Sequence, residues 1–294
     1  MKPLRTALFA PGIRDRVMTK ALDSGADAVI FDLEDSVPVA AKAEARSLVG
    51  KAIAEAGARN AAPAVYVRVN AAASRQLDED LSAVVRPGLA GIFLPKAESV
   101  EEVLQTAEVI ERCEVSRGMT AHTVEIVLMI ESALGVYRCF DMLRASPRVA
   151  TSCIGGARDG DLQTDLGCSW SIEGTELMYA RSKVLLDTRA AGKLYPLDGV
   201  FSDLEDEAGL RQDTKLSARL GYVGRTVIHP RQIVPVRESY AVPEAEVAYY
   251  REVVAEFEAA EKAGQAAIVV AGRLVDYAMY GRAKRMLALA ELDQ

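Results

Sequence analysis

The chain has 294 residues, half of them apolar, and carries 35 Lys and Arg against 42 Asp and Glu, a formal net charge of −7. This acidic balance argues against nucleic acid as the main partner, because phosphate binding needs a basic stripe. No run approaches the roughly 18 to 20 apolar residues that cross a membrane, and no signal-peptide block follows Met1. The four cysteines lack zinc or redox spacing. We therefore expect a cytoplasmic protein with neither a membrane nor a nucleic-acid partner.

Short apolar runs alternate with longer amphipathic stretches along the chain. The eight runs span residues 6–10, 28–32, 64–68, 91–95, 125–130, 151–155, 199–202 and 226–228. Each is a nearly continuous apolar segment, which is typical of strands buried on both faces. Strands that alternate with helices predict an α/β fold, here a (β/α)8 TIM barrel. The alternative is an open doubly wound sheet, but no Gly-x-Gly-x-x-Gly turn follows the first run.

The chain continues beyond the eighth run. Residues 243–263 predict one helix, because Pro243 stands near its start and Gly264 lies just past its end. A short apolar segment (267–271) and a basic helix (278–289) follow.

We expect this tail to be too short to form a core of its own. We expect a catalytic barrel domain over residues 1–235 and a C-terminal helical extension over 236–294. The extension should pack on the barrel or reach over a neighbouring subunit.

Polar residues stand where most predicted strands end, and in a TIM barrel this edge holds the active site. Seven of the eight strands carry ionisable groups there, namely Arg14, Asp32 with Glu34 and Asp35, Arg68, Lys96, Glu131, Asp159 with Asp161, and His229. We therefore expect these side chains to meet around one pocket.

Two of these strand ends predict a metal site. Glu131 and one acid of the Asp159/Asp161 pair follow adjacent strands. One or two carboxylates with water suit Mg²⁺, and the Cys or His clusters that zinc prefers are missing at these positions. The alternative is that each acid pairs with a neighbouring arginine such as Arg158.

Arg68 predicts recognition of a carboxylate, because a planar guanidinium binds that group with two hydrogen bonds. A salt bridge at the barrel mouth is the alternative. Glu34 and Asp35 are candidate catalytic residues, although loop solvation or helix capping explains at least one acid of their segment. Lys96 as a Schiff-base nucleophile would define another aldolase chemistry, but a metal makes a second electrophile redundant.

Nine short motifs occur in the order of a known family. They are Phe9-Ala-Pro-Gly12, Phe31-Asp-Leu-Glu-Asp-Ser-Val37, Arg68-Val-Asn70, Leu94-Pro-Lys96, Ile130-Glu-Ser-Ala133, Asp161-Leu-Gln-Thr-Asp-Leu-Gly167, Glu173-Gly-Thr-Glu-Leu177, Ile228-His-Pro230 and Gly272-Arg-Leu-Val-Asp276. Together they resemble the citrate lyase beta-chain-like and malyl-CoA lyase family of the HpcH/HpaI aldolase superfamily. The resemblance runs from about Leu4 to the last helix.

The resemblance implies a Mg²⁺ site, with Mn²⁺ as a possible substitute. Glu131 matches the first ligand and also contacts the substrate, and Arg68 matches the arginine that binds the carboxylate of the acid. The second ligand is an aspartate after the sixth strand. The downstream Asp-Leu-Gly spacing selects Asp161, whereas the upstream Gly-Ala-x-Asp pattern selects Asp159. We prefer Asp161, because the downstream segment aligns without a gap.

The resemblance also implies coenzyme A as part of the substrate, contacted by residues that match Phe9, Arg14, Lys20, Ile228 and His229. Asp276 matches an acid on a C-terminal lid that closes over the adjacent subunit in relatives. The implied protein is a homo-oligomer, a trimer or hexamer.

The implied reaction is a Mg²⁺-dependent cleavage, or formation, of a 3-hydroxyacyl-CoA thioester such as malyl-CoA or citramalyl-CoA. Its products are an acyl-CoA and an α-keto acid, and Asp276 is the candidate for proton transfer. Three alternatives stay open. They are an aldolase for free hydroxy-keto acids, a malyl-CoA thioesterase, and a citrate-lyase-type subunit that works only with an acyl-carrier partner.

Overall fold

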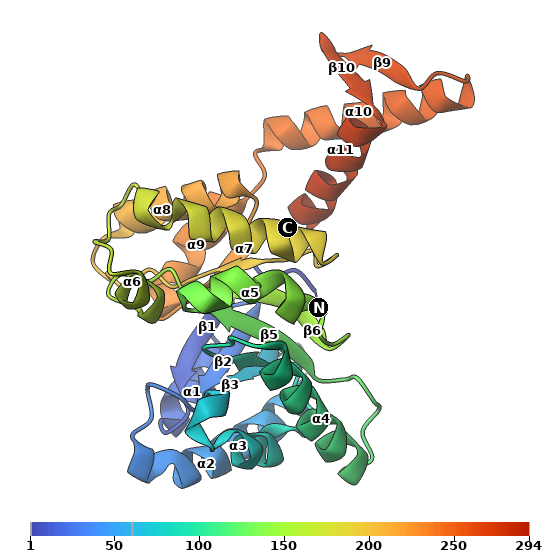
Figure 1. The fold of residues 1–294 in the computed structure, drawn as a ribbon. Helices are drawn as coiled ribbons and strands as arrows, with labels where there is room; N and C mark the ends of the chain where they lie inside the picture. Colours follow the sequence, from blue (N-terminus) through green and yellow to red (C-terminus); the bar gives the residue numbers. More distant parts are fainter. Residues whose placement is uncertain (1, 60–61, 294) are drawn as a thin grey trace. The chain divides into compact units, whose positions relative to one another are not determined.

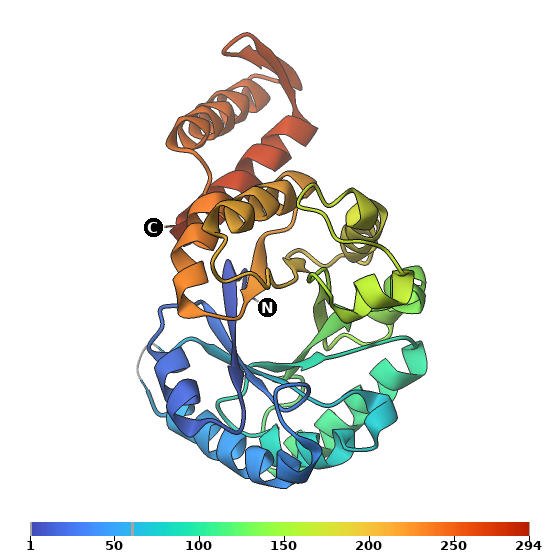
Figure 2. The same cartoon turned by 90° about the vertical axis from the view of Figure 1, so that its left-hand side faces the viewer.

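The computed structural model describes residues 2–59 and 62–293. Parallel strands close into one barrel in chain order from β1 to β8. Their bounds are Thr6–Pro11, Ala28–Asp32, Ala64–Arg68, Gly91–Leu94, Glu125–Ile130, Val149–Ile154, Leu197–Asp198 and Gly224–Val227. Figure 2 shows these strands enclosed by an outer layer of helices. The predicted TIM barrel is therefore confirmed.

Helices follow the strands around the outside of the barrel (Figure 1). They are α1 (Asp15–Leu22), α2 (Lys42–Gly57), α3 (Leu77–Val84), α4 (Val100–Ser116), α5 (Ala133–Arg144), α6 (Asp161–Leu166), α7 (Met178–Ala190), α8 (Glu207–Leu220) and α9 (Ile233–Tyr240). Short 3-10 turns span Val39–Ala41, Ala72–Ser74, Thr175–Leu177, Pro230–Gln232 and Glu291–Asp293. No helix in the described part of the chain is both long and apolar enough to cross a membrane.

Two helices begin at well-formed caps directly after the mouth of the barrel. Ser99 and Glu102 form a reciprocal capping box at the start of α4. The Ser132 hydroxyl accepts the Gly135 N–H at the start of α5. Because these caps fix where α4 and α5 start, they also fix the loops that carry Lys96 and Glu131.

The barrel interior is filled by side chains. Its buried apolar cluster comprises Leu4, Ala7, Ala28, Ile30, Tyr66, Phe93, Val127, Met129, Cys153 and Leu197. The barrel is thus a packed core and no pore, as this fold requires. Space for a ligand exists only at its ends.

The prediction for the seventh strand was wrong. We expected it over residues 199–202, but β7 is Leu197–Asp198. The Gly199 carbonyl oxygen accepts hydrogen bonds from Nε and Nη2 of Arg225 at 3.0 and 2.8 Å, so it bonds to a side chain of β8 and not to the backbone of that strand. The chain leaves the sheet at this point, and the apolar residues that follow pack in a loop.

The remaining strands were misplaced by at most two residues at an end. β6 begins at Val149 and β8 at Gly224, each two residues before the predicted start. A 3-10 turn, Thr175–Leu177, directly precedes α7.

Contacts divide the chain into two compact units, Met1–Ser239 and Tyr240–Gln294. The second unit contains α10 (Glu244–Lys262), an antiparallel hairpin of β9 (Ala267–Val270) and β10 (Arg273–Asp276), and α11 (Tyr277–Ala290). It was expected to lack a core of its own, and this was wrong. Phe257 is fully buried there, stacked on Tyr280 with 4.9 Å between ring centroids. The unpredicted hairpin adds Val270 and Val275 to that cluster.

Candidate active site

Arg68 and Asp32 form the rigid base of the site. They end β3 and β2, and the parallel register places them side by side. The guanidinium Nε and Nη2 donate to the two Asp32 oxygens at 2.7 and 2.8 Å. Burial disfavours the Asp32 carboxylate, but the hydrogen bonds and charge of Arg68 outweigh this and lower its pKa. Arg68 also lies over the Phe9 ring, 5.0 Å from its centroid.

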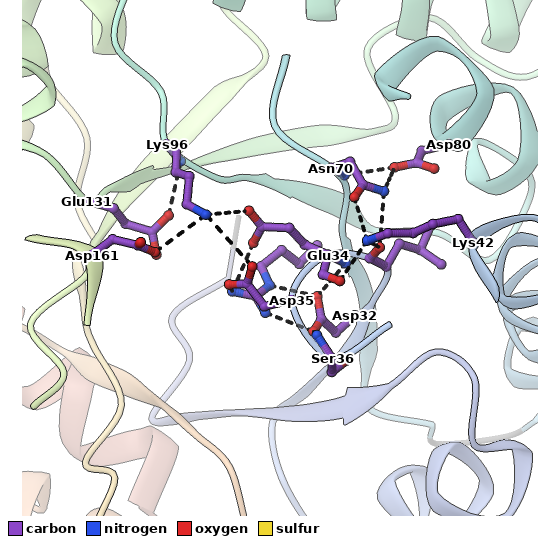
Figure 3. A network of polar contacts seen from close by, with 12 residues as sticks. Asp32, Glu34, Asp35, Ser36, Lys42, Asn70, Asp80, Lys96, Glu131 and Asp161 are labelled. Atoms are coloured by element: carbon purple, nitrogen blue, oxygen red, sulfur yellow. Dashed lines mark hydrogen bonds and ion pairs between the residues drawn. The ribbon is translucent and has the colours of Figure 1, made fainter. Parts of the chain in front are cut away.

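Lys96 joins acids from two segments, the loop after β2 and the start of α6. Its Nζ lies 3.1 Å from Glu34 Oε1, 3.8 Å from Asp35 Oδ1 and 3.5 Å from Asp161 Oδ2. Figure 3 shows the ammonium group between these carboxylates. Burial opposes its charge, but Glu34 and the other two acids outweigh burial and raise the Lys96 pKa. A permanently charged Lys96 disfavours the Schiff-base alternative, because a nucleophilic lysine must lose its proton.

The backbone conformation of Lys96 is unusual. Its φ of 51° lies in the left-handed region, which is strained for a residue with a side chain. The Lys96 N–H donates to Glu131 Oε2 at 3.0 Å. Lys96 therefore holds one candidate metal ligand with its main chain and the other, Asp161, with its ammonium group.

Glu131 is a buried carboxylate beside other acids. It follows β5 and is 8% exposed. Burial, together with the charges of Glu34 and Asp161, raises its pKa to about 7, although Arg68 and the Lys96 N–H oppose the rise. Gly155 makes room for it, because a Cβ at that position would lie 2.6 Å from Glu131 Cγ. Asp161, the first residue of α6, lies next to it (Figure 3).

The chemistry of these side chains fits a divalent cation. Within the described residues, no cluster of three or more His, Cys, Asp or Glu side chains is placed to hold an ion, so Glu131 and Asp161 would supply two ligands. Mg²⁺ commonly takes one or two carboxylates and completes its shell with water and substrate. Five carboxylates (Asp32, Glu34, Asp35, Glu131 and Asp161) lie around the two cations Arg68 and Lys96. This excess of negative charge suits a divalent cation.

A family model, HpcH/HpaI aldolase/citrate lyase, matches residues 5–230. The chain belongs to this family. It shares 36% identity over 289 residues with the citrate lyase subunit beta of Escherichia coli K12, covering 98% of this chain and 94% of that one. It shares 31% identity over 313 residues with the L-malyl-CoA/beta-methylmalyl-CoA lyase of Cereibacter sphaeroides, covering 99% and 96% of the two chains. Membership makes the protein a lyase.

A solved structure of the same family resembles the whole chain. It is the protein CitE from Mycobacterium tuberculosis in complex with magnesium, acetoacetate and coenzyme A. The TM-score is 0.74 at 27% identity, and 98% of each chain is covered. The likeness thus includes both the lyase-family barrel and the C-terminal helices.

The two aspartates proposed for the second ligand lie in different surroundings. The Asp159 side chain is 84% exposed, and its Oδ2 lies 3.8 Å from Nε of Arg158. Its φ is 58°, and its N–H donates to Gln163 Oε1 at 2.7 Å. Of the two, only Asp161 pairs with Lys96, which also pairs with Glu34. This geometry favours Asp161.

The residues predicted to contact coenzyme A lie on the first and last βα units of the barrel. Arg14 and Lys20 are exposed at the two ends of α1. Ile228 is 38% exposed directly after β8. The Nδ1 atom of His229 accepts a backbone N–H two residues on, at 3.1 Å, and so caps the 3-10 turn that follows β8. His229 therefore has a structural task whether or not it binds a ligand.

Asp276 caps a helix in the second unit. Its Oδ1 accepts the N–H groups of Ala278 and Met279 at 2.8 and 3.2 Å, at the start of α11. Both bonds use one oxygen of the carboxylate.

Sequence reasoning missed Lys42, which lies beneath the acidic loop formed by Leu33, Glu34 and Asp35. Lys42 is 7% exposed and donates to that loop from the first turn of α2. A signal was present, because Lys42 falls on the same helical face as the buried Ala45 and Val49. A lysine on an apolar face is a reason to look for buried acceptors.

Proposed function

We propose that this chain is a Mg²⁺-dependent lyase that cleaves, or forms, a carbon–carbon bond in a 3-hydroxyacyl-CoA thioester. The products of cleavage are an acyl-CoA and an α-keto acid. The observation that carries the proposal is the buried Glu131 carboxylate beside Asp161, bordered by Arg68 and Lys96. Its support from relatives is a malyl-CoA lyase and a solved structure with magnesium, acetoacetate and coenzyme A.

Glu131 and Asp161 are the residues that would hold Mg²⁺, or Mn²⁺ in its place. When bound, the ion polarises the oxygen of the keto acid as a Lewis acid. Glu131 is oriented for this by the Lys96 N–H, and Asp161 by the Lys96 ammonium group. Such outer contacts commonly tune metal affinity.

Arg68 would bind the carboxylate of the keto acid with one defined edge. Its Nε and Nη2 already form a fork with Asp32. The edge between Nη1 and Nη2 therefore receives the substrate. Glu34 Oε2 lies 3.1 Å from Nη1 and keeps this edge oriented.

Two fixed cations would lower the energy of the thioester enolate that cleavage produces. Lys96 and Arg68 are held by acids, so they need little rearrangement when negative charge develops. Glu34 and Asp35 act through these cations in this scheme and not on the substrate itself.

The second unit and the ends of the barrel would complete the reaction. We propose Asp276 as the group that removes the hydroxyl proton and returns a proton to the acyl carbon. It would act on the site of a neighbouring copy in a homotrimer or hexamer. Phe9, Arg14, Lys20, Ile228 and His229 would contact coenzyme A.

The test is product analysis with four thioesters. Purified full-length protein and Mg²⁺ are incubated with malyl-, methylmalyl-, citramalyl- and citryl-CoA, and the keto acid is measured as its hydrazone. Release of glyoxylate, pyruvate or oxaloacetate, abolished by EDTA, is the expected result. Free coenzyme A with intact hydroxy acid would identify a thioesterase instead. Absence of keto acid with all four thioesters refutes the proposal.

A further inference from the structure

Lys42 places a charged group beneath the acidic loop, inside the protein. Its Nζ donates to the carbonyl oxygens of Leu33 and Glu34 at 2.6 and 2.7 Å, and to Asn70 Oδ1 at 2.7 Å. An ammonium group has three protons, and these three short bonds use all of them. Figure 3 shows Lys42 reaching the loop from the side opposite Lys96.

The acceptor Asn70 is itself fixed. Its Nδ2 donates to Leu33 O at 3.0 Å and to Asp80 Oδ2 at 2.7 Å, and its backbone N–H donates to the same Asp80 oxygen. The other Asp80 oxygen pairs with Arg46 Nε at 2.7 Å. Asp80 is fully buried and Asn70 is 3% exposed. The Asn70 acceptor of Lys42 is thus held in place by a buried carboxylate.

Burial of this charge is unfavourable by itself. Burial lowers the pKa of Lys42, and the charges of Asp32 and Asp80 oppose the shift. All three direct acceptors are neutral oxygens, so a direct ion pair does not explain the residue. An apolar side chain of the same length would take the Lys42 donor from the Asn70 amide oxygen and would leave each carbonyl with one donor in place of two, Asn70 Nδ2 for Leu33 and the Val37 N–H for Glu34. The contacts therefore serve the backbone of the loop at Leu33 and Glu34.

That backbone determines where the Glu34 side chain lies. Glu34 extends from the loop to Arg68 Nη1 at 3.1 Å and to Lys96 Nζ at 3.1 Å. Glu34 is the one side chain of the network described here that pairs with both cations at this distance. A shift of its main chain would therefore take one close ion-pair partner from both cations at once, although Asp32 still holds Arg68 and Asp161 still contacts Lys96.

We infer that Lys42 is a positioning residue of the active site, which fixes the backbone at Leu33 and Glu34 so that Glu34 holds Arg68 and Lys96 in place. The inference rests on the proposed lyase function for its catalytic consequence. It does not require Lys42 to touch the substrate.

The activity test compares Lys42→Met with Lys51→Met, a matched control on the same helix. Lys51 is 69% exposed, and its nearest acid is Glu55 at 3.7 Å. With the thioester that the wild type cleaves, Lys42→Met should lower kcat about 10- to 100-fold, because catalysis is sensitive to ångström-scale displacement. KM should change less than kcat, because the coenzyme A contacts proposed on α1 and after β8 do not belong to this network. Lys51→Met should match the wild type. A Lys42→Met enzyme with wild-type kcat overturns the inference.

A double-mutant cycle separates positioning from general stability. If Lys42 acts through Glu34, adding Lys42→Met to Glu34→Gln should change kcat by no more than about twofold. If the two losses multiply, Lys42 does not act through Glu34 and the inference fails. Should Lys42→Met not fold, Lys42→Gln is judged by the same criteria, because its shorter amide keeps donors without the charge.

Amide hydrogen exchange gives a readout that is independent of the substrate. The N–H groups of Leu33, Glu34, Ser36 and Val37 all have partners in the wild type. Lys42→Met should speed exchange in residues 33–37 at least about tenfold, and Lys51→Met should not. Unchanged exchange in this segment overturns the inference. If the wild type cleaves none of the four thioesters, the proposed function fails, and exchange alone decides the role of Lys42.

Discussion

Substitution of Glu131 by glutamine should stabilise the metal-free protein at pH 8 and abolish its lyase activity. The pKa of Glu131 lies at about 7 in the fold against 4.5 in the open chain. Each pH unit of this difference corresponds to about 1.4 kcal/mol, so the ionised carboxylate destabilises the metal-free fold by about 3 kcal/mol above pH 7. Glutamine has the same shape, carries no charge and keeps an oxygen for the Lys96 N–H.

The pH dependence identifies the cause. An acid with a raised pKa in the fold leaves stability unaffected below its unfolded pKa of 4.5 and lowers it progressively up to about pH 7. The difference in free energy of unfolding between Glu131→Gln and the wild type should therefore be small at pH 5 and about 2 to 3 kcal/mol larger at pH 8. Urea denaturation followed by circular dichroism, with EDTA present, measures both values. Other titrating groups cancel in the difference.

Addition of metal should reverse the order of stability. Mg²⁺ at 1,000 times its dissociation constant stabilises a folded protein by about 4.1 kcal/mol, which exceeds the destabilisation by the ionised carboxylate, and only the wild type keeps the Glu131 carboxylate as a ligand. The reasoning is refuted if the stability difference is the same at pH 5 and pH 8, or if Mg²⁺ stabilises both proteins equally.

Three further results are expected. Asp161→Asn should weaken Mn²⁺ binding at least about tenfold by electron paramagnetic resonance, and Asp159→Asn should leave it within about twofold; the reverse order would assign the ligand to Asp159. Gly155→Ala should also weaken Mn²⁺ binding while the circular dichroism spectrum stays unchanged, because the new Cβ would lie 2.6 Å from Glu131 Cγ; wild-type affinity would contradict this. Glu114→Gln should lower the free energy of unfolding by about 3 kcal/mol at pH 7, because it leaves a buried arginine unpaired. Burial opposes ionisation of Glu114, but its arginine and backbone donors lower its pKa, so this loss should shrink as the pH falls below about 4.5; a loss that is constant with pH would show another cause.

The strands and the edge that holds the site could be predicted because both depend on local sequence. Strands buried on two faces must be apolar throughout, so runs such as residues 28–32 are visible without any partner. The carboxyl ends of parallel strands meet at one edge, so Arg68 and Glu131 could be assigned to the same pocket. The side chains that these two residues contact depend on the folded structure and cannot be found from the local sequence.

Side-chain partners could not be predicted in the same way. Arg68 was predicted to bind a substrate carboxylate, with a salt bridge at the barrel mouth as the alternative. In the structure its Nε and Nη2 atoms donate to Asp32. Lys96 received little weight because a metal makes a second electrophile redundant, and its three acidic partners could not be found because they lie far from it in sequence. β7 was misplaced because a long-range arginine contact lies where it ends. Each case concerns a contact between residues far apart in sequence, which no local pattern encodes.

The register of β2 and β3 has a consequence for substrate choice. With Asp32 along one side of its guanidinium and Phe9 against its plane, Arg68 has few alternative rotamers. An unrestrained arginine gives up about 2 kcal/mol of conformational entropy when it is immobilised, and folding has already removed most of that freedom here. The same rigidity prevents Arg68 from following acids of different length. If Arg68 binds an oxo acid as proposed, selection between a short and a long one must come from the other loops at this mouth of the barrel.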